Sequence, residues 1–168
     1  MALSAIALHA AHAALLGMLY ALVNAEVVAP YMDEPFHLRQ TESYCAGRWS
    51  DWEPKLTTFP GLFLLGGLGA RLVGVERACT LGALRALNLL PALATPYLLH
   101  ALLRRLHPAL SRTDLLGNAA VLALVPTHFF YHFLYYTDTA STCCAFLLLL
   151  LGLPECSLAR GRAARRGD

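Results

Sequence analysis

The chain has 168 residues, of which 57% are hydrophobic and 14% charged, and its formal net charge is +2. Soluble domains contain about 45 to 50% apolar and about 25% charged residues, so this composition excludes an ordinary soluble globule and predicts a membrane protein. The basic residues are spread along the chain apart from Arg160, Arg162, Arg165 and Arg166 near its end, which leaves no broad basic face for nucleic acid.

Five apolar runs lie between the charged residues, at 2–25, 56–70, 86–103, 115–137 and 139–154. A helix needs about 20 apolar residues to cross a bilayer, so the first, third and fourth runs qualify and the other two are borderline. We predict one all-α membrane domain over 1–168, a polytopic transmembrane helical bundle with approximate spans 3–25, 57–75, 84–103, 115–136 and 139–153. Five crossings are favoured over four.

The first run has two interpretations. Val23-Asn24-Ala25 resembles a signal-peptide cleavage site, but no Lys or Arg precedes Arg39 and the run is longer than the roughly 7 to 15 residues of a signal h-region. We expect a retained anchor, and under either interpretation the loop 30–57 faces a lumen. The first three loops, of which 30–57 is the first, carry equal numbers of basic residues, so the positive-inside rule leaves the orientation open. Five crossings from a cytosolic N-terminus would place the basic tail in the lumen, which conflicts with the positive-inside rule.

The acidic pair Asp33-Glu34 follows the first run directly. Proline is favoured at the first helical position and acidic side chains favour the N-terminal end of a helix, so we predict a short amphipathic helix from Pro35 to about Ala46, ended by Gly47. Two carboxylates where a span meets water are suited to take a proton from a substrate hydroxyl group. Helix capping by the same pair is an equally weighted alternative.

No metal site and no disulfide are predicted. Glu34 and His37 have the spacing of one half of a carboxylate di-metal site, but only one copy of that motif is present. The five cysteines are odd in number and show no C-x-x-C spacing, so we expect neither a disulfide framework nor a zinc site. They are Cys45, Cys79, Cys143, Cys144 and Cys156.

Two further features lie in or near the apolar runs. Gly66, Gly67, Gly69 and Gly74 provide small surfaces for close helix packing. Asp138 is either a functional acid inside the membrane or the cap of the helix that follows it. Capping is favoured because a charge in hydrocarbon costs several kcal/mol and a turn at the interface avoids that cost.

Several segments, in order and at family-like spacing, resemble the dolichyl-phosphate-glucose-dependent alpha-1,2-glucosyltransferases of the endoplasmic reticulum, which belong to the GT-C class. The resemblance implies transfer of the third, terminal glucose by inverting displacement. The donor would be dolichyl phosphate glucose, and the acceptor the diglucosylated dolichyl-diphosphate oligosaccharide of protein N-glycosylation. The matching segments are Pro30-Tyr31-Met32-Asp33-Glu34-Pro35-Phe36-His37, Tyr44-Cys45, Trp52-Glu53-Pro54-Lys55-Leu56-Thr57-Thr58-Phe59-Pro60-Gly61-Leu62, Leu84-Arg85-Ala86-Leu87-Asn88-Leu89-Leu90 and Phe133-Leu134-Tyr135-Tyr136-Thr137-Asp138.

By this resemblance, Asp33 is the first candidate for the catalytic base and Glu34 the second. His37, Lys55 and Arg85 are candidates for substrate binding, and the two cations suit the leaving phosphate. No cofactor is implied. The implied location is the endoplasmic reticulum membrane, with several spans in the lipid bilayer and the acidic loop in the lumen.

Length is the main departure from the family, whose members are more than twice as long. The chain is therefore expected to be an N-terminal fragment or a short form of such an enzyme. The alternative is a catalytically incomplete membrane protein that associates with a polytopic partner.

Overall fold

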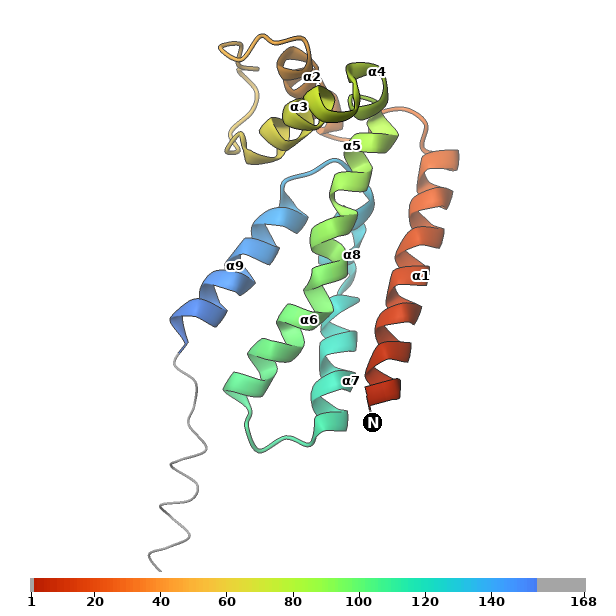
Figure 1. Cartoon of the computed structure of the whole chain (residues 1–168), viewed down its shortest axis with the longest axis vertical. Helices are drawn as coiled ribbons and strands as arrows, with labels where there is room; N and C mark the ends of the chain where they lie inside the picture. Colours follow the sequence, from red (N-terminus) through yellow and green to blue (C-terminus); the bar gives the residue numbers. More distant parts are fainter. Residues whose placement is uncertain (1, 154–168) are drawn as a thin grey trace, which may run out of the picture.

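The structure, a computed structural model, describes residues 2–153. Within those residues every regular element is a helix, so the all-α prediction is confirmed there (Figure 1). The arginine-rich end lies outside the described residues. The elements are α1 (Ala2–Glu26), α2 (Glu34–Cys45), α3 (Gly61–Val73), α4 (Val75–Ala78), α5 (Leu81–Leu87), α6 (Leu89–Leu106), α7 (Arg112–Ala123), α8 (Pro126–Phe130), the 3-10 helix η1 (Tyr131–Phe133) and α9 (Asp138–Gly152).

Two helical stretches of the described chain are long and apolar enough to cross a membrane. They are Ala5–Glu26, within α1, and Leu81–Leu106, which joins α5 and α6. The apolar helices α3 and α9 have 13 and 15 residues and are shorter than that criterion. The number of crossings beyond these two stretches stays a prediction.

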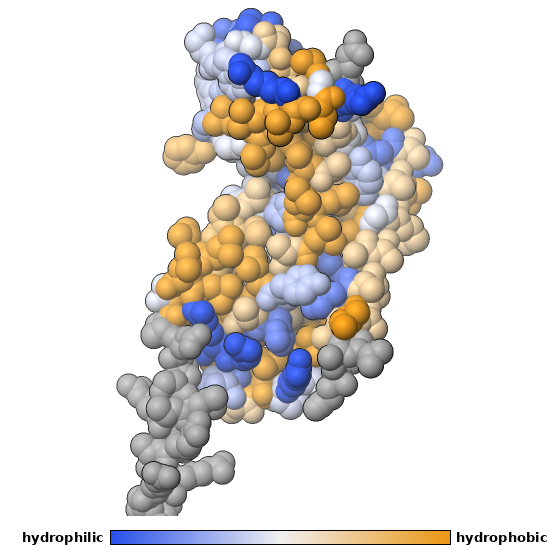
Figure 2. Space-filling view, viewed as in Figure 1, coloured by the Kyte–Doolittle hydropathy of each residue, from blue (hydrophilic) through white to orange (hydrophobic). Residues whose placement is uncertain are grey.

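Helix α6 is the centre of the long bundle and contacts α1, α7 and α9 (Figure 1). Buried apolar side chains join it to its neighbours: Ala92 packs with Leu16 of α1, and Leu99 packs with Ala119 of α7. Hydrophobic residues cover much of the middle of the molecule, and hydrophilic residues gather towards its two ends (Figure 2). This distribution is the one expected of helices that lie in a bilayer.

Local sequence explains where several of these helices begin. The Thr80 hydroxyl accepts a hydrogen bond from the Ala83 N–H group at the start of α5, and Ser111 does the same for Asp114 at the start of α7. The predicted span 115–136 is divided, because α7 ends at Ala123 and α8 begins at Pro126. Proline lacks an N–H donor and disfavours helical geometry in the residue before it, so a break is expected there.

Helices α2 and α3 lie side by side across one end of the bundle (Figure 1). The observed α2 matches the helix predicted from Pro35, and Gly47 follows it with φ of 80°. A Cβ atom on Gly66 would lie 2.5 Å from Cγ2 of Thr41, and one on Gly67 would lie 2.8 Å from Cβ of Tyr44. The expected packing role of these two glycines is therefore confirmed. It is wrong for Gly74, where a Cβ atom would meet nothing within 4 Å, and at Gly69 the nearest atom would lie 4.0 Å away.

A disulfide joins Cys45, the last residue of α2, to Cys79, the residue after α4. The expectation that the cysteines form no disulfide is wrong for this pair. The two residues are 34 positions apart in sequence, but α2 packs against α3 and α3 packs against α4, which brings their Cα atoms to 6.6 Å, within the range that a disulfide spans. Spacing along the chain could not reveal this, because the pairing depends on how the helices pack.

Candidate functional site

Glu34, the first residue of α2, is completely buried and accepts four hydrogen bonds. Its Oε1 accepts from Nε of Arg85 at 2.8 Å and from the Tyr135 N–H group at 2.6 Å. Its Oε2 accepts from Nη2 of Arg85 at 2.6 Å and from the Tyr31 N–H group at 2.8 Å. One carboxylate thus joins α2, α5, the connection between α1 and α2, and the segment before α9.

Arg85 of α5 is equally buried, and all five of its N–H donors are directed at acceptors. Two go to the Glu34 carboxylate in the side-by-side geometry typical of arginine and a carboxylate. Nη1 donates to the carbonyl oxygen of Val27 at 2.7 Å and to Oδ1 of Asn24 at 3.4 Å, and Nη2 donates to the carbonyl oxygen of Ala29 at 3.4 Å. In this arrangement Arg85 fastens the end of α1 to the start of α2.

These contacts also set the protonation of Glu34. Burial alone would raise the pKa of its carboxyl group, but the hydrogen bonds from Arg85 and from the N–H groups of Tyr135 and Tyr31 outweigh burial and lower the pKa. The carboxylate is therefore ionised at neutral pH, fully hydrogen-bonded and away from solvent. Such a group is a weak acceptor for a substrate proton.

Asp33, one residue earlier, has a different environment. It is exposed, and its carboxylate makes no capping hydrogen bond to α2, so the capping interpretation is wrong for Asp33. Its backbone N–H group donates to Oη of Tyr136 at 2.5 Å. Met32 just before it has φ of 54°, a left-handed conformation that is uncommon for residues other than glycine and is often found at functional sites.

Tyr136 is buried beside this acidic pair. Burial raises the pKa of its phenol, and the charges of Asp33 and Glu34 raise it further, although the hydrogen bond from Asp33 opposes them. The phenol is therefore protonated at neutral pH. Because its oxygen accepts from the Asp33 N–H group, its own O–H group remains a donor beside the Asp33 backbone.

His37 and Thr41 continue the site along the buried face of α2. The backbone carbonyl oxygen of Tyr135 lies 2.8 Å from Nδ1 of His37 and can only accept, so Nδ1 carries the proton and Nε2 is left as an acceptor in the neutral ring. Oγ1 of Thr41 lies 2.8 Å from Oη of Tyr135. The turn of α2 after the acidic pair is thus held against residues 134–136.

Asn88 holds the same segment from the other side. Its Nδ2 donates to the carbonyl oxygens of Leu134 at 2.5 Å and of Tyr136 at 2.8 Å. No role was predicted for Asn88, Tyr135 or Tyr136, although all three lie in the segments that resemble the glucosyltransferases. The signal was that polar residues lie inside otherwise apolar runs, where a buried polar group needs a specific partner.

The remaining candidates lie outside this buried network. Lys55 is exposed, and its Nζ lies 4.8 Å from the centre of the Phe36 ring. Asp138 is the first residue of α9 and is exposed there, where a carboxylate favours the helix dipole. The favoured interpretation of Asp138 as the cap of this helix is wrong, because the N-cap position is Thr137.

The buried network brings together three segments that are far apart in the sequence. They are the acidic segment 30–37, the segment 84–90 and the segment 133–138, and the hydrogen bonds of Glu34, Arg85 and Asn88 join them. We refer to ten residues that the hydrogen bonds described above join to one another as the Glu34 network: Asn24, Tyr31, Asp33, Glu34, His37, Thr41, Arg85, Asn88, Tyr135 and Tyr136.

Comparison with known proteins gives a consistent family assignment. The model of the DIE2/ALG10 family matches residues 27–162. A protein of Rattus norvegicus is 37% identical over 155 residues, and one of Homo sapiens is 36% identical over 155 residues. A protein of Arabidopsis thaliana is 38% identical over 132 residues. All three are named Dol-P-Glc:Glc(2)Man(9)GlcNAc(2)-PP-Dol alpha-1,2-glucosyltransferase.

These alignments cover most of this chain but only part of each relative. They include 80% of the chain and 31% of the rat protein, 80% and 32% for the human protein, and 71% and 26% for the Arabidopsis protein. The chain therefore spans about a third of the length of the curated relatives that it matches. No solved structure matches the chain.

Proposed function

Because the chain belongs to the DIE2/ALG10 family, we propose that it carries the acidic first loop of a dolichyl-phosphate-glucose-dependent alpha-1,2-glucosyltransferase. The proposed reaction is transfer of the third glucose to the diglucosylated lipid-linked oligosaccharide. One observation carries this proposal: three of the segments that resemble the glucosyltransferases meet in the Glu34 network, directly beside the exposed carboxylate of Asp33. The relatives are about three times as long as this chain. Their names therefore do not establish that this chain alone has the activity of the whole enzyme, and that activity is part of the proposal.

Asp33 is the proposed catalytic base. The acceptor hydroxyl oxygen attacks C1 of the glucose and gives its proton to the Asp33 carboxylate, while the bond from C1 to the phosphate oxygen breaks. Dolichyl phosphate leaves already ionised and needs no general acid. Attack opposite the leaving group converts the β-linked donor to an α-linked product.

Glu34 is proposed to position Asp33 rather than to take the proton itself. Its lowered pKa, its burial and its four hydrogen bonds favour a fixed carboxylate that anchors the start of α2. Of the two cations considered for the leaving phosphate, Lys55 is better suited in this arrangement, because every donor of Arg85 already has an acceptor. Nε2 of His37 is the proposed acceptor for a substrate hydroxyl group.

We propose that the loop and α2–α4 lie in the lumen of the endoplasmic reticulum. Disulfides persist in oxidising compartments, so the Cys45–Cys79 pair supports this placement. Both cysteines must lie on the same side of the membrane, which disfavours a crossing by α3 between them.

The resulting proposal is four crossings in place of the five favoured from the sequence. They are α1, α5 with α6, α7 through η1, and α9. An even number of crossings puts the start of α1 and the end of α9 on the same side, the cytosolic one. This arrangement removes the conflict with the positive-inside rule that five crossings produce.

Complementation tests the proposed function. The chain is expressed in cells that lack the terminal glucosyltransferase, and their lipid-linked oligosaccharides are resolved by chromatography. Return of the triglucosylated species supports the proposal. Persistence of the diglucosylated species, beside a working full-length control, contradicts activity of this chain alone and favours the alternative of an incomplete protein that acts with a partner.

The role of Asp33 is tested by Asp33→Asn, with Glu42→Gln as the matched control. Both acids are exposed and belong to the start or the body of α2, so neither change should disturb folding. Asp33→Asn is expected to lower turnover by about 100-fold or more, the effect of losing a positioned base, and Glu42→Gln to leave it unchanged. Wild-type turnover in Asp33→Asn would move the base to another residue.

A further inference from the structure

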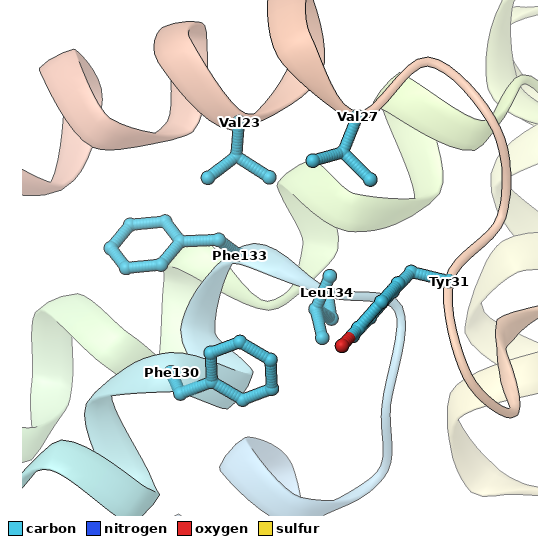
Figure 3. A pocket seen from close by; sticks show the side chains of 6 residues that line it. All are labelled: Val23, Val27, Tyr31, Phe130, Phe133 and Leu134. Carbon is cyan, nitrogen blue, oxygen red and sulfur yellow. The ribbon is translucent and has the colours of Figure 1, made fainter.

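An apolar groove lies between the end of α1 and the α8–η1 segment, next to the Glu34 network. Figure 3 shows side chains from the two segments facing each other across it, and the one polar atom on these side chains is the Tyr31 hydroxyl oxygen. The groove has a volume of about 160 Å³. Its lining residues are Val23, Val27, Tyr31, Phe130, Phe133 and Leu134.

One end of the groove lies at the end of the candidate membrane span in α1, and the other end lies beside the Glu34 network. Val23 lies in the last turn of the candidate span Ala5–Glu26, and Val27 follows directly after it, so the groove begins where hydrocarbon meets headgroups. Its other end adjoins the network, because the Tyr31 N–H group donates to Glu34 and the Leu134 carbonyl accepts from Asn88. The groove walls are thus fixed by the bonds that hold the acidic pair.

The groove is large enough for a short piece of hydrocarbon. A dry apolar cavity of roughly 150 Å³ takes up benzene, which has six carbons, and an isoprene unit has five. We propose that this groove holds the isoprene unit nearest the phosphate in a polyprenyl phosphate glucose donor. The inference rests on the proposed function, since it concerns the lipid of the same reaction.

Geometry favours the donor lipid over the acceptor lipid. In the acceptor named for the relatives, the oligosaccharide Glc(2)Man(9)GlcNAc(2) separates the terminal glucose from the lipid. In the donor, one phosphate separates the transferred glucose from its lipid. The donor chain must therefore lie within a sugar and a phosphate of the base, and the groove adjoins Tyr31, two residues before Asp33.

Photo-crosslinking tests this inference without requiring turnover. The photoreactive residue p-benzoylphenylalanine replaces Phe130, which lines the groove, or Tyr97, an exposed aromatic residue of α6 that does not. Each full chain, in detergent-solubilised membranes, is irradiated with dolichyl phosphate tritium-labelled glucose. A groove-filling substitution, Val27→Trp, is compared with Val28→Trp at the exposed neighbouring position.

The expected result is label on the Phe130 variant, no more than background on the Tyr97 variant, and loss of the label with Val27→Trp but not with Val28→Trp. Unlabelled dolichyl phosphate should compete, and excess dolichyl-diphosphate oligosaccharide should not. Equal labelling at both positions, or labelling that Val27→Trp leaves unchanged, would overturn the proposal. Competition by the acceptor alone would assign the groove to the acceptor lipid and overturn it as well.

Photo-crosslinking and complementation together distinguish failure of this inference from failure of the proposed function. Asp33→Asn should abolish glucose transfer and leave labelling at Phe130 intact, because it removes the base and not the groove. Failure of complementation with intact, competed labelling would contradict the proposed function while supporting the groove. Successful complementation with no specific labelling would support the function and refute the groove.

Discussion

Replacing Arg85 by methionine should destabilise the protein more than any exposed arginine substitution. The change keeps an apolar side chain of similar length but removes five N–H donors. Glu34 is left as a buried charge with hydrogen bonds only from the N–H groups of Tyr31 and Tyr135. The carbonyl oxygen of Val27 loses its bond from Nη1 of Arg85, so two parts of the network are affected together.

The expected cost follows from burial. Both side chains of the pair are almost inaccessible, at 1% and 0% of their surface, and removing one partner of a buried pair costs about 3 to 5 kcal/mol. Native proteins are stable by only about 5 to 15 kcal/mol, so this loss is a large fraction of the total. The Arg48–Asp51 pair provides the contrast, because its side chains are 57% and 52% exposed and such pairs contribute about 0 to 1 kcal/mol.

The free energy of unfolding can be measured by SDS titration in bicelles with tryptophan fluorescence as the signal. The chain has two tryptophans, both beside the α2–α3 layer: Trp49 stacks on Tyr44 and Trp52 packs against Phe63. Arg85→Met should shift the transition to much lower SDS, and Arg48→Met should leave it nearly unchanged. Equal effects of the two substitutions would refute the conclusion that the buried pair holds the start of α2.

Three further outcomes are expected. Gly66→Ala should cost about 1 to 3 kcal/mol in the same titration because its methyl group would overlap Thr41, while Gly69→Ala, with no atom closer than 4.0 Å, should be neutral or stabilising; equal effects would contradict the close packing of α2 and α3. The folded-state pKa of Glu34 is lowered, so its stabilisation is fully present above the unfolded-state value of about 4.3 and is lost as pH falls through the folded value. The difference in unfolding free energy between wild type and Glu34→Gln should therefore be constant from pH 7 to about 5 and shrink at lower pH, and a pH-independent difference would argue against an ionised Glu34. Chain isolated from microsomes should migrate differently on gels with and without reductant, and Cys79→Ser should abolish that difference; a pair found reduced would contradict the lumenal placement.

The two adjacent acids have different environments because of helix geometry. Successive positions at a helix start point about 100° apart, so one acid can be buried while its neighbour is exposed. Glu34 faces α5 and the segment before α9, whereas Asp33 faces solvent. The residues alone favour capping and catalysis equally, because an acidic side chain at this position suits both.

The sequence by itself determined the features that depend on short stretches of chain. Composition indicated a helical protein with segments apolar enough to cross a membrane, and Pro35 and Gly47 predicted the extent of α2 to within a residue or so. The order of the matching segments identified the family. These inferences succeed because helix boundaries and apolar length are local properties of the chain.

Only the tertiary structure decided which residues meet. It paired Arg85 with Glu34 across 51 positions and Cys45 with Cys79 across 34, and it laid α3 beside α2 instead of along the bundle. Charge and cysteine spacing could not reveal these contacts, because each depends on the packing of several helices at once. Burial then separated a fixed carboxylate at Glu34 from an available one at Asp33, since a buried charge is stable only where the fold supplies all its partners.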